Sequence, residues 1–265
     1  MSKKIKKQYL KRVEIGATDS RLFRTIIEQK FVRKNHAEKY IFHGSKSYAV
    51  TRIQKLKRYG FLKGVAMLAN EPECLLLDKA SVKAFRKAKP PAHLAGYTYP
   101  KPQNKIETVG YEHDWKTTEV RLIFENLNFC SDWKSEKLLK AGLKGDRKVP
   151  DGIFTRWGIG IAVEVELTLK KAKSYRQILG IYDRYSEIKY VLYVCETKKM
   201  IDFISDLVRR NYRRPEQAKK EYCFMLFQDL VDFRENAPIW TPFKGNLCLG
   251  HLIFGKDFSR GRNSL

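Results

Sequence analysis

The sequence predicts two domains that both mix helices and strands, an α+β domain followed by an α/β domain. A chain of 265 residues is long enough for one large domain or for two small ones, each with its own core. Residues 87–105 are rich in proline, glycine and polar residues and show no periodicity, which is typical of a linker. We therefore assign residues 1–86 to the first domain, residues 87–105 to a linker and residues 106–265 to the second domain.

The composition indicates a globular protein with a polyanionic partner. Hydrophobic residues make up 43% of the chain and aromatic residues 12%, which is enough to build a core. The 53 Lys and Arg residues against 29 Asp and Glu residues give a net charge of +24, and such a charge repels itself in the compact state. Nucleic acid is the polyanion that we expect to compensate it. The alternative is a basic surface that only keeps the protein soluble.

Neither a membrane nor a disulfide framework is expected. No stretch approaches the roughly 20 apolar residues of a spanning helix, and the basic N-terminus has no apolar segment behind it. The five cysteines are scattered and form no CxxC pair, which argues against a zinc site. We expect reduced, mostly buried thiols in a cytoplasmic protein.

The first domain is predicted to contain two helices and a hairpin after a basic tail, residues 1–12. The stretch TDSRLFRTIIEQKFV predicts the first helix, and a second one follows that Ser45 or Ser47 caps and Gly60 ends. An extended segment then begins, and ECLLLDKASVKAF is its predicted partner strand. The apolar residues at helical spacing are Leu22, Phe23, Ile26, Ile27 and Phe31 in the first helix and Val50, Ile53 and Leu56 in the second.

This order of two helices and a hairpin resembles a winged helix-turn-helix. A helix with one apolar and one basic face can pack on its domain and lie in the major groove of double-stranded DNA. The alternative is an ordinary amphipathic helix with a solvated charged face. The predicted DNA-binding residues here are Lys46, Arg52, Lys55, Lys57 and Arg58.

The second domain is predicted to follow the order α-β-β-β-α-β-α. A helix over HDWKTTEVRLIFENL comes first, and SEKLLKAG and VPDGIFTRW are short strand candidates. The β-branched run IGIAVEVELTL predicts a central strand, followed by a helix over SYRQILGIYDRYSEI. A buried strand, YVLYVCET, and a helix, KMIDFISDLVRRNY, come next. Residues 221–233 are ambiguous, and we take YCFMLFQDL as a further strand.

Two carboxylates interrupt the predicted central strand. Glu164 and Glu166 are two residues apart and therefore lie on the same face of a strand. Burying unpaired carboxylates is costly, whereas a divalent cation such as Mg²⁺ or Mn²⁺ would bind them through oxygen. Asp151, directly after a proline, reaches the same place if the two strands pair. The alternative is that both glutamates face solvent or pair with lysine and arginine.

These residues resemble two known groups of proteins. Pro-Asp followed by a strand with Glu-x-Glu is similar to the PD-(D/E)xK nuclease-like core, which has the α-β-β-β-α-β order. More narrowly, a winged helix followed by HDW, VPDGIF, VEVELTLKKAKSYRQILGIY and YVLYVC resembles the replication-relaxation family of plasmids and mobile elements. This resemblance covers the chain from about residue 18 to about residue 200.

The resemblance implies that Asp151 and Glu164 are metal ligands of a restriction-endonuclease-like domain. Glu166 occupies the position where the nuclease motif has lysine, so another lysine would have to replace it. Glu119, on the preceding helix, corresponds to a further acidic ligand of some related nucleases, whereas His113 and Asp114 are expected mainly to cap that helix. The candidate catalytic residues are Asp151, Glu164, Glu166, Lys170 and Lys171, with Lys173 as another possible replacement; Lys173 and Arg176 are also candidates for binding DNA.

Three functions follow from these patterns. The first is a metal-dependent DNA endonuclease or nickase that acts on plasmid or mobile-element DNA. The second is an inactive DNA-binding accessory protein, which contacts other replication, mobilisation or transposition proteins. The third is an RNA-binding protein with a basic aromatic surface, although the sequence contains no RNA-recognition motif.

Overall fold

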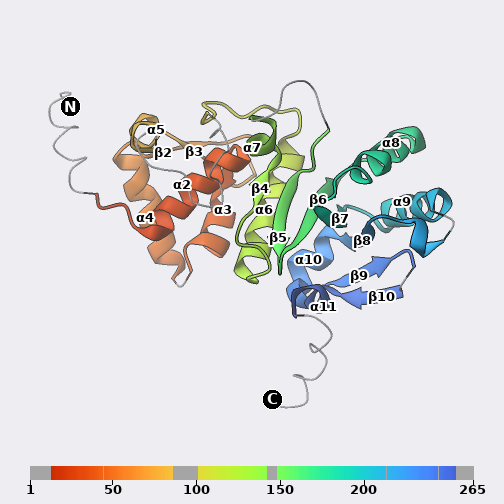
Figure 1. Cartoon of the computed structure of the whole chain (residues 1–265). Coiled ribbons are helices and arrows are strands. Elements are labelled where there is room, and N and C mark those ends of the chain that lie inside the picture. The colour runs from red at the N-terminus through yellow and green to blue at the C-terminus, as the bar shows by residue number, and fades with distance from the viewer. Residues whose placement is uncertain are drawn as a thin grey trace, which may run out of the picture. The chain divides into compact units, whose positions relative to one another are not determined.

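The computed structural model describes residues 13–43, 45–85, 101–141, 148–212, 214–243 and 245–254. Helices and strands are mixed throughout these residues, as expected, and the strands form two sheets (Figure 1). The chain divides into two compact units. Unit 1 holds residues 1–122 and 137–142, and unit 2 holds residues 123–136 and 143–265. The predicted basic tail and most of the predicted linker lie outside the described residues.

Unit 1 contains helices around a small antiparallel sheet with the strand order β1-β3-β2. The two predicted helices and the hairpin that follows them are present, although β3 is shorter than predicted because Lys79–Phe85 are helical. The short elements between the two helices were not predicted from the sequence. In order, the elements are α2 (Ala17–Gln29), β1 (Val32–Arg33), α3 (Lys34–His36), the π-helix η1 (Ala37–Ile41), α4 (Lys46–Arg58), β2 (Leu62–Val65), β3 (Cys74–Leu77), α5 (Lys79–Phe85), most of α6 (Tyr111–Asn126) and α7 (Glu136–Ala141).

Helix α4 begins and ends as the sequence predicts. The side chain of Ser45 accepts a hydrogen bond from the backbone N–H of Tyr48 at 3.5 Å, which caps the first turn. Ile53 and Leu56 are fully buried and hold the helix on the unit. Gly60 has a φ of 75°, a conformation that glycine adopts without steric cost, and it ends the helix.

Unit 2 is built on a sheet whose described strands follow the order β10-β9-β8-β7-β6-β5-β4. The three central strands β6, β7 and β8 are parallel, and the outer strands pair antiparallel. The strands are β4 (Lys134–Ser135), β5 (Gly152–Arg156), β6 (Ile159–Glu166), β7 (Ile188–Cys195), β8 (Glu221–Leu226), β9 (Pro238–Thr241) and β10 (Gly245–Cys248). The helices are α8 (Ala172–Tyr182), α9 (Lys198–Asn211), η3 (Pro215–Gln217), α10 (Phe227–Phe233), η4 (Arg234–Asn236) and α11 (Leu249–Phe254).

Two strand predictions in this region were wrong in part. The stretch SEKLLKAG pairs as a strand only at Ser135, and the rest forms α7, because EKLLKA consists of strong helix formers and buries Leu138. The stretch YCFMLFQDL changes from β8 to α10 between Leu226 and Phe227. Both segments are short, so periodicity alone does not separate helix from strand in them.

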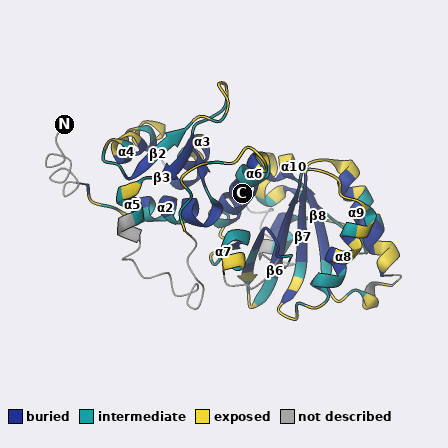
Figure 2. Ribbon diagram, turned by 90° about the horizontal axis from the view of Figure 1, so that it is seen from above, coloured by how far each residue is buried: buried dark blue, intermediate teal, exposed yellow. Residues whose placement is uncertain are grey.

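The central strands are buried on both faces (Figure 2). On one face, α8 and α9 pack through a cluster that includes Tyr175, Leu179 and Ile204. On the other face, the rings of Trp133 and Phe154 stack with centroids 6.0 Å apart. The Trp133 ring lies directly over the backbone of Gly152, where a Cβ would come within 2.0 Å of it. Glycine is therefore required at this position.

Candidate functional site: a buried carboxylate cluster

The pairing of β5 with β6 brings Asp151 beside Glu164. Gly152 is the register partner of Val163 in this antiparallel pair. Asp151, which precedes Gly152, therefore lies across from Glu164, which follows Val163. The Oδ2 atom of Asp151 accepts a hydrogen bond from the backbone N–H of Val165 at 2.7 Å. Asp151 is 6% exposed, so this hydrogen bond is shielded from water. The predicted strand pairing is confirmed.

Glu164 is a fully enclosed carboxylate with two protein partners. It is 1% exposed, its Oε2 atom lies 2.9 Å from the Nζ atom of Lys148, and its Oε1 atom accepts a hydrogen bond from the hydroxyl of Tyr182. Burial and the neighbouring charge of Asp151 raise the pKa of Glu164 from 4.5 to about 7, although Lys148 and Tyr182 act in the opposite direction.

Lys148 is a member of this cluster that was not predicted from the sequence. Burial alone would lower the pKa of its ammonium group, but Glu164 and Asp151 outweigh burial and raise that pKa. The lysine therefore stays charged beside the carboxylates. The available signal was the stretch KVPD, in which Lys148 precedes Asp151 by three residues.

Glu166 lies on the same face of β6 and has its own set of partners. It is 2% exposed, and the ammonium group of Lys170 forms an ion pair with its Oε1 atom. The hydroxyl of Tyr175, on α8, donates to its Oε2 atom at 3.4 Å. Of the basic residues predicted to replace the missing lysine, the structure places Lys170 at a carboxylate. The other basic residues predicted in this segment are exposed and form no ion pair within the described residues: Lys171, Lys173 and Arg176.

Glu119 belongs to a different cluster, in unit 1. The hydroxyl of Tyr40 donates to its Oε1 atom at 2.8 Å, and the Nε2 atom of His36 lies 3.3 Å from its Oε2 atom. Burial lowers the pKa of His36 to about 3, with Arg33 adding to the effect, so this imidazole is neutral. Burial raises the pKa of Glu119. Asp114 forms an ion pair with Lys30 at 2.6 Å. These contacts of Glu119 and Asp114 are with residues of unit 1 and do not involve Asp151, Glu164 or Glu166.

The donor atoms of unit 2 suit a hard divalent cation, because Asp151 and Glu164 are neighbouring carboxylates. In the folded protein, however, Glu164 is already bound by protein groups. Lys148 binds its Oε2 atom and Tyr182 binds its Oε1 atom. Among the residues that the structure describes, no three His, Cys, Asp or Glu side chains are grouped so that they could hold a metal ion. A cation at Glu164 would therefore have to take the place of Lys148.

The basic residues predicted on α4 fall into two groups. Arg52 is held by the carboxylate of Asp19, with its Nε atom 2.9 Å from Oδ1, and Lys57 forms an ion pair with Glu73 at 2.6 Å. These two side chains therefore connect α4 to its own unit. The remaining three predicted residues are exposed: Lys46, Lys55 and Arg58.

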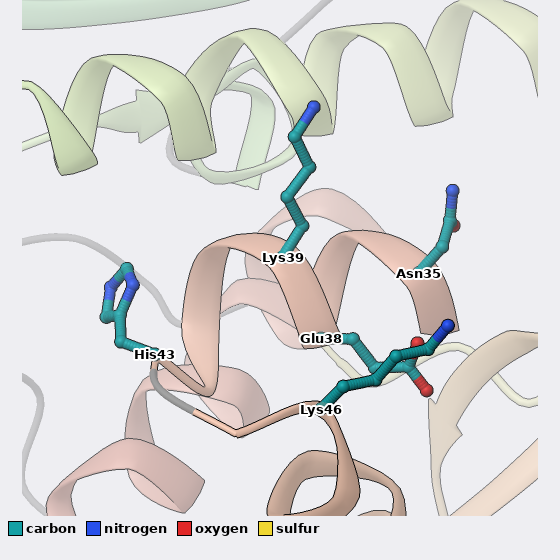
Figure 3. A pocket seen from close by; sticks show the side chains of 5 residues that line it. All are labelled: Asn35, Glu38, Lys39, His43 and Lys46. Atoms are coloured by element: carbon teal, nitrogen blue, oxygen red, sulfur yellow. The ribbon is translucent and has the colours of Figure 1, made fainter.

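A pocket of about 370 Å³ opens beside the first turn of α4. Its lining is polar and contains Lys39, Lys46 and Glu38, together with Asn35 and His43 (Figure 3). The ends of Lys39 and Lys46 point in different directions rather than toward a common point. This arrangement does not build a convergent site for one small anion.

No family model, no curated protein and no solved structure matches this chain. Among the described residues, no helix has both the length and the apolar character that a membrane crossing requires. The features that bear on function are therefore the carboxylate cluster of unit 2, the exposed basic residues of α4 and the net charge of the chain.

Proposed function

We propose that this protein binds double-stranded DNA through unit 1, in the manner of a winged helix, and that unit 2 is a nuclease-like domain of the PD-(D/E)xK type. In this proposal Lys46, Lys55 and Arg58 contact phosphates, because they are exposed on or at the start of α4. The net charge of +24 supplies the long-range attraction. The protein would act on plasmid or mobile-element DNA in the cytoplasm, together with other replication, mobilisation or transposition proteins.

The enzymatic part of the proposal is a divalent-metal-dependent endonuclease or nickase. The observation that carries it is the convergence of Asp151 and Glu164 across β5 and β6, fixed by the hydrogen bond of 2.7 Å from the Val165 N–H to Asp151. Asp151 and Glu164 would hold Mg²⁺ or Mn²⁺. When bound, such a cation supplies a more acidic water and stabilises charge on a scissile phosphate.

A second candidate function is favoured by the contacts of the two glutamates. Lys148 and Tyr182 bind Glu164, and Lys170 and Tyr175 bind Glu166, so the protein already neutralises both side chains. In that case unit 2 is a DNA-binding accessory domain, and the carboxylate cluster contributes to its structure rather than to catalysis. Lys170 then acts as a structural counter-charge to Glu166.

The experiment that separates the two candidates is a nicking assay on supercoiled plasmid with Mg²⁺ or Mn²⁺ at low salt. The variants are Asp151→Asn and Glu164→Gln, which keep the shape and an acceptor oxygen at each position. Glu187→Gln, at an exposed carboxylate of unit 2, is the matched control. Each protein is first shown to be folded by circular dichroism and to bind the same duplex.

Relaxation by the wild type and the control, but not by the two site variants, would establish the nuclease. DNA binding without relaxation, combined with no Mn²⁺ binding in calorimetry, would establish the accessory role. If the wild type does not bind the DNA duplex, both candidates are refuted.

A further inference from the structure

The hairpin between β5 and β6 carries an unusual residue at its tip. Arg156 and Ile159 are paired, so Trp157 and Gly158 alone form the turn, and their φ values are 50° and 75°. Two positive φ values in a two-residue loop define a type I′ turn. Such turns favour Asn-Gly, and a bulky aromatic residue at the first position is a steric outlier. The turn therefore holds a tryptophan at a conformational cost.

This tryptophan does not contribute to a core that would compensate for the cost. Trp157 is 61% exposed, and it is the one exposed tryptophan of the chain, since the described residues include all four. The guanidinium of Arg156 lies 4.7 Å from the centre of its ring and covers one face. The same arginine donates from its NH1 atom to the backbone carbonyl of Asn128 at 2.6 Å, which fixes its position. The ring is thus held in place with open surface toward solvent.

The surroundings of the hairpin tip are mainly basic. Gly160 pairs with Ile188, and Tyr190 pairs with Glu221. The N-terminal ends of β6, β7 and β8 therefore lie at the same end of the sheet as the hairpin tip. The ionisable groups at this end of the sheet include exposed Arg184, Lys189 and Lys219, together with Glu187, Glu221 and Asp132, whose Oδ1 atom accepts a hydrogen bond from the backbone N–H of Thr155 at 2.9 Å. With Arg156, the positive charges outnumber the negative ones.

We propose that Trp157 is a stacking platform for an unpaired base of DNA, with Arg156 beside it to receive the adjoining phosphate. Aromatic rings that stack on bases, set among basic side chains, are the means by which proteins hold single-stranded nucleic acid without reading its sequence. This inference extends the proposed DNA binding, and it assigns to unit 2 a contact with single-stranded DNA that is separate from the duplex contact of α4. The platform is at the opposite end of β5 and β6 from the carboxylate cluster.

The test uses Trp157→Asn, which creates the Asn-Gly pair that a type I′ turn prefers. We expect this variant to be at least as stable as the wild type, with a melting temperature higher by about 2–4 °C. Its affinity for a labelled oligothymidine should fall about 5- to 100-fold, while its affinity for a blunt duplex of the same length changes less than about twofold. Trp157→Phe should keep most of the affinity for the single strand. Phe233→Ala, at another exposed aromatic residue, is the matched control and should bind as the wild type does.

Three results would overturn the inference. The first is equal binding of the single strand by the wild type and Trp157→Asn. The second is an equal loss for duplex and single strand, which would make the effect one of general affinity. The third is a lower melting temperature of Trp157→Asn, which would make Trp157 a structural residue. If the wild type binds the duplex and these variants fail to differ, only this inference falls; if the wild type binds no DNA, the proposed function falls with it.

Discussion

Glu164→Gln is expected to stabilise the protein, and more so as the pH rises. The amide has the shape of the protonated acid and can still accept a hydrogen bond from Tyr182, but it has no charge to bury. The pKa of Glu164 is raised in the folded state, so the folded protein binds more protons than the unfolded chain between the two pKa values. Stability contributed by this group is present below pH 4.5 and is lost as the pH rises through about 7.

The size of the effect follows from the pKa change. A rise from 4.5 to about 7 in the folded state corresponds to about 3 kcal/mol of lost stability once the carboxylate is ionised. The variant does not undergo this loss. The difference in unfolding free energy, variant minus wild type, should therefore increase by about 3 kcal/mol across the interval and stay flat outside it.

Urea unfolding at closely spaced pH values, followed by tryptophan fluorescence, measures this difference. Glu187→Gln, at an exposed carboxylate, should show no comparable trend and corrects for the general effect of removing a negative charge. A difference for Glu164→Gln that does not change with pH would refute the argument that burial dominates at this carboxylate. A difference that decreases as the pH rises would show that the ion pair with Lys148 outweighs burial.

Three further predictions concern packing, metal and DNA. Gly152→Ala should lower stability by about 1–3 kcal/mol, because its Cβ would meet the ring of Trp133. Gly180→Ala, in open space on α8, should raise stability by about 0.5–1 kcal/mol. Melting curves of the two variants measure both changes. Lys148→Ala should bind Mn²⁺ at least about tenfold more tightly than the wild type if a cation can take the place of the ammonium group, and calorimetry that shows equal or weaker binding contradicts this. Lys55→Ala and Arg58→Ala should each reduce the dependence of duplex affinity on salt by about one unit of slope, and unchanged slopes in fluorescence anisotropy would remove α4 from the DNA contact.

The elements with a strong pattern could be predicted from the sequence. Helix α4 has a serine cap, a buried apolar stripe and a terminal glycine, and β6 and β7 are mainly β-branched or apolar, apart from the two glutamates of β6 and Lys189 in β7. The short elements could not be predicted in this way. The π-helix Ala37–Ile41 and strand β1 depend on contacts within unit 1 rather than on periodicity. Helix α7 was missed because six residues are too few to separate a helix from a strand by pattern.

The candidate site could be predicted only in part, for a similar reason. The period of two along a strand places Glu164 and Glu166 on one face, and the pairing of β5 with β6 supplies Asp151. The partners of these carboxylates come from other positions along the chain. Lys148 lies in an irregular segment before β5, and Tyr175 and Tyr182 come from a helix whose tyrosines are also core residues. A sequence pattern does not distinguish a tyrosine that packs from one that also donates to a buried carboxylate.

The two units are interleaved along the chain, and this affects how the protein can be synthesised. The chain passes between the units at residues 122/123, 136/137 and 142/143. Helix α7 completes unit 1, where the Nζ atom of Lys137 donates to the backbone carbonyl of Ile27 at 2.8 Å. A nascent chain must therefore release residues 123–136, which belong to unit 2, before unit 1 is complete. Folding of the first unit on the ribosome cannot finish until part of the second has already emerged.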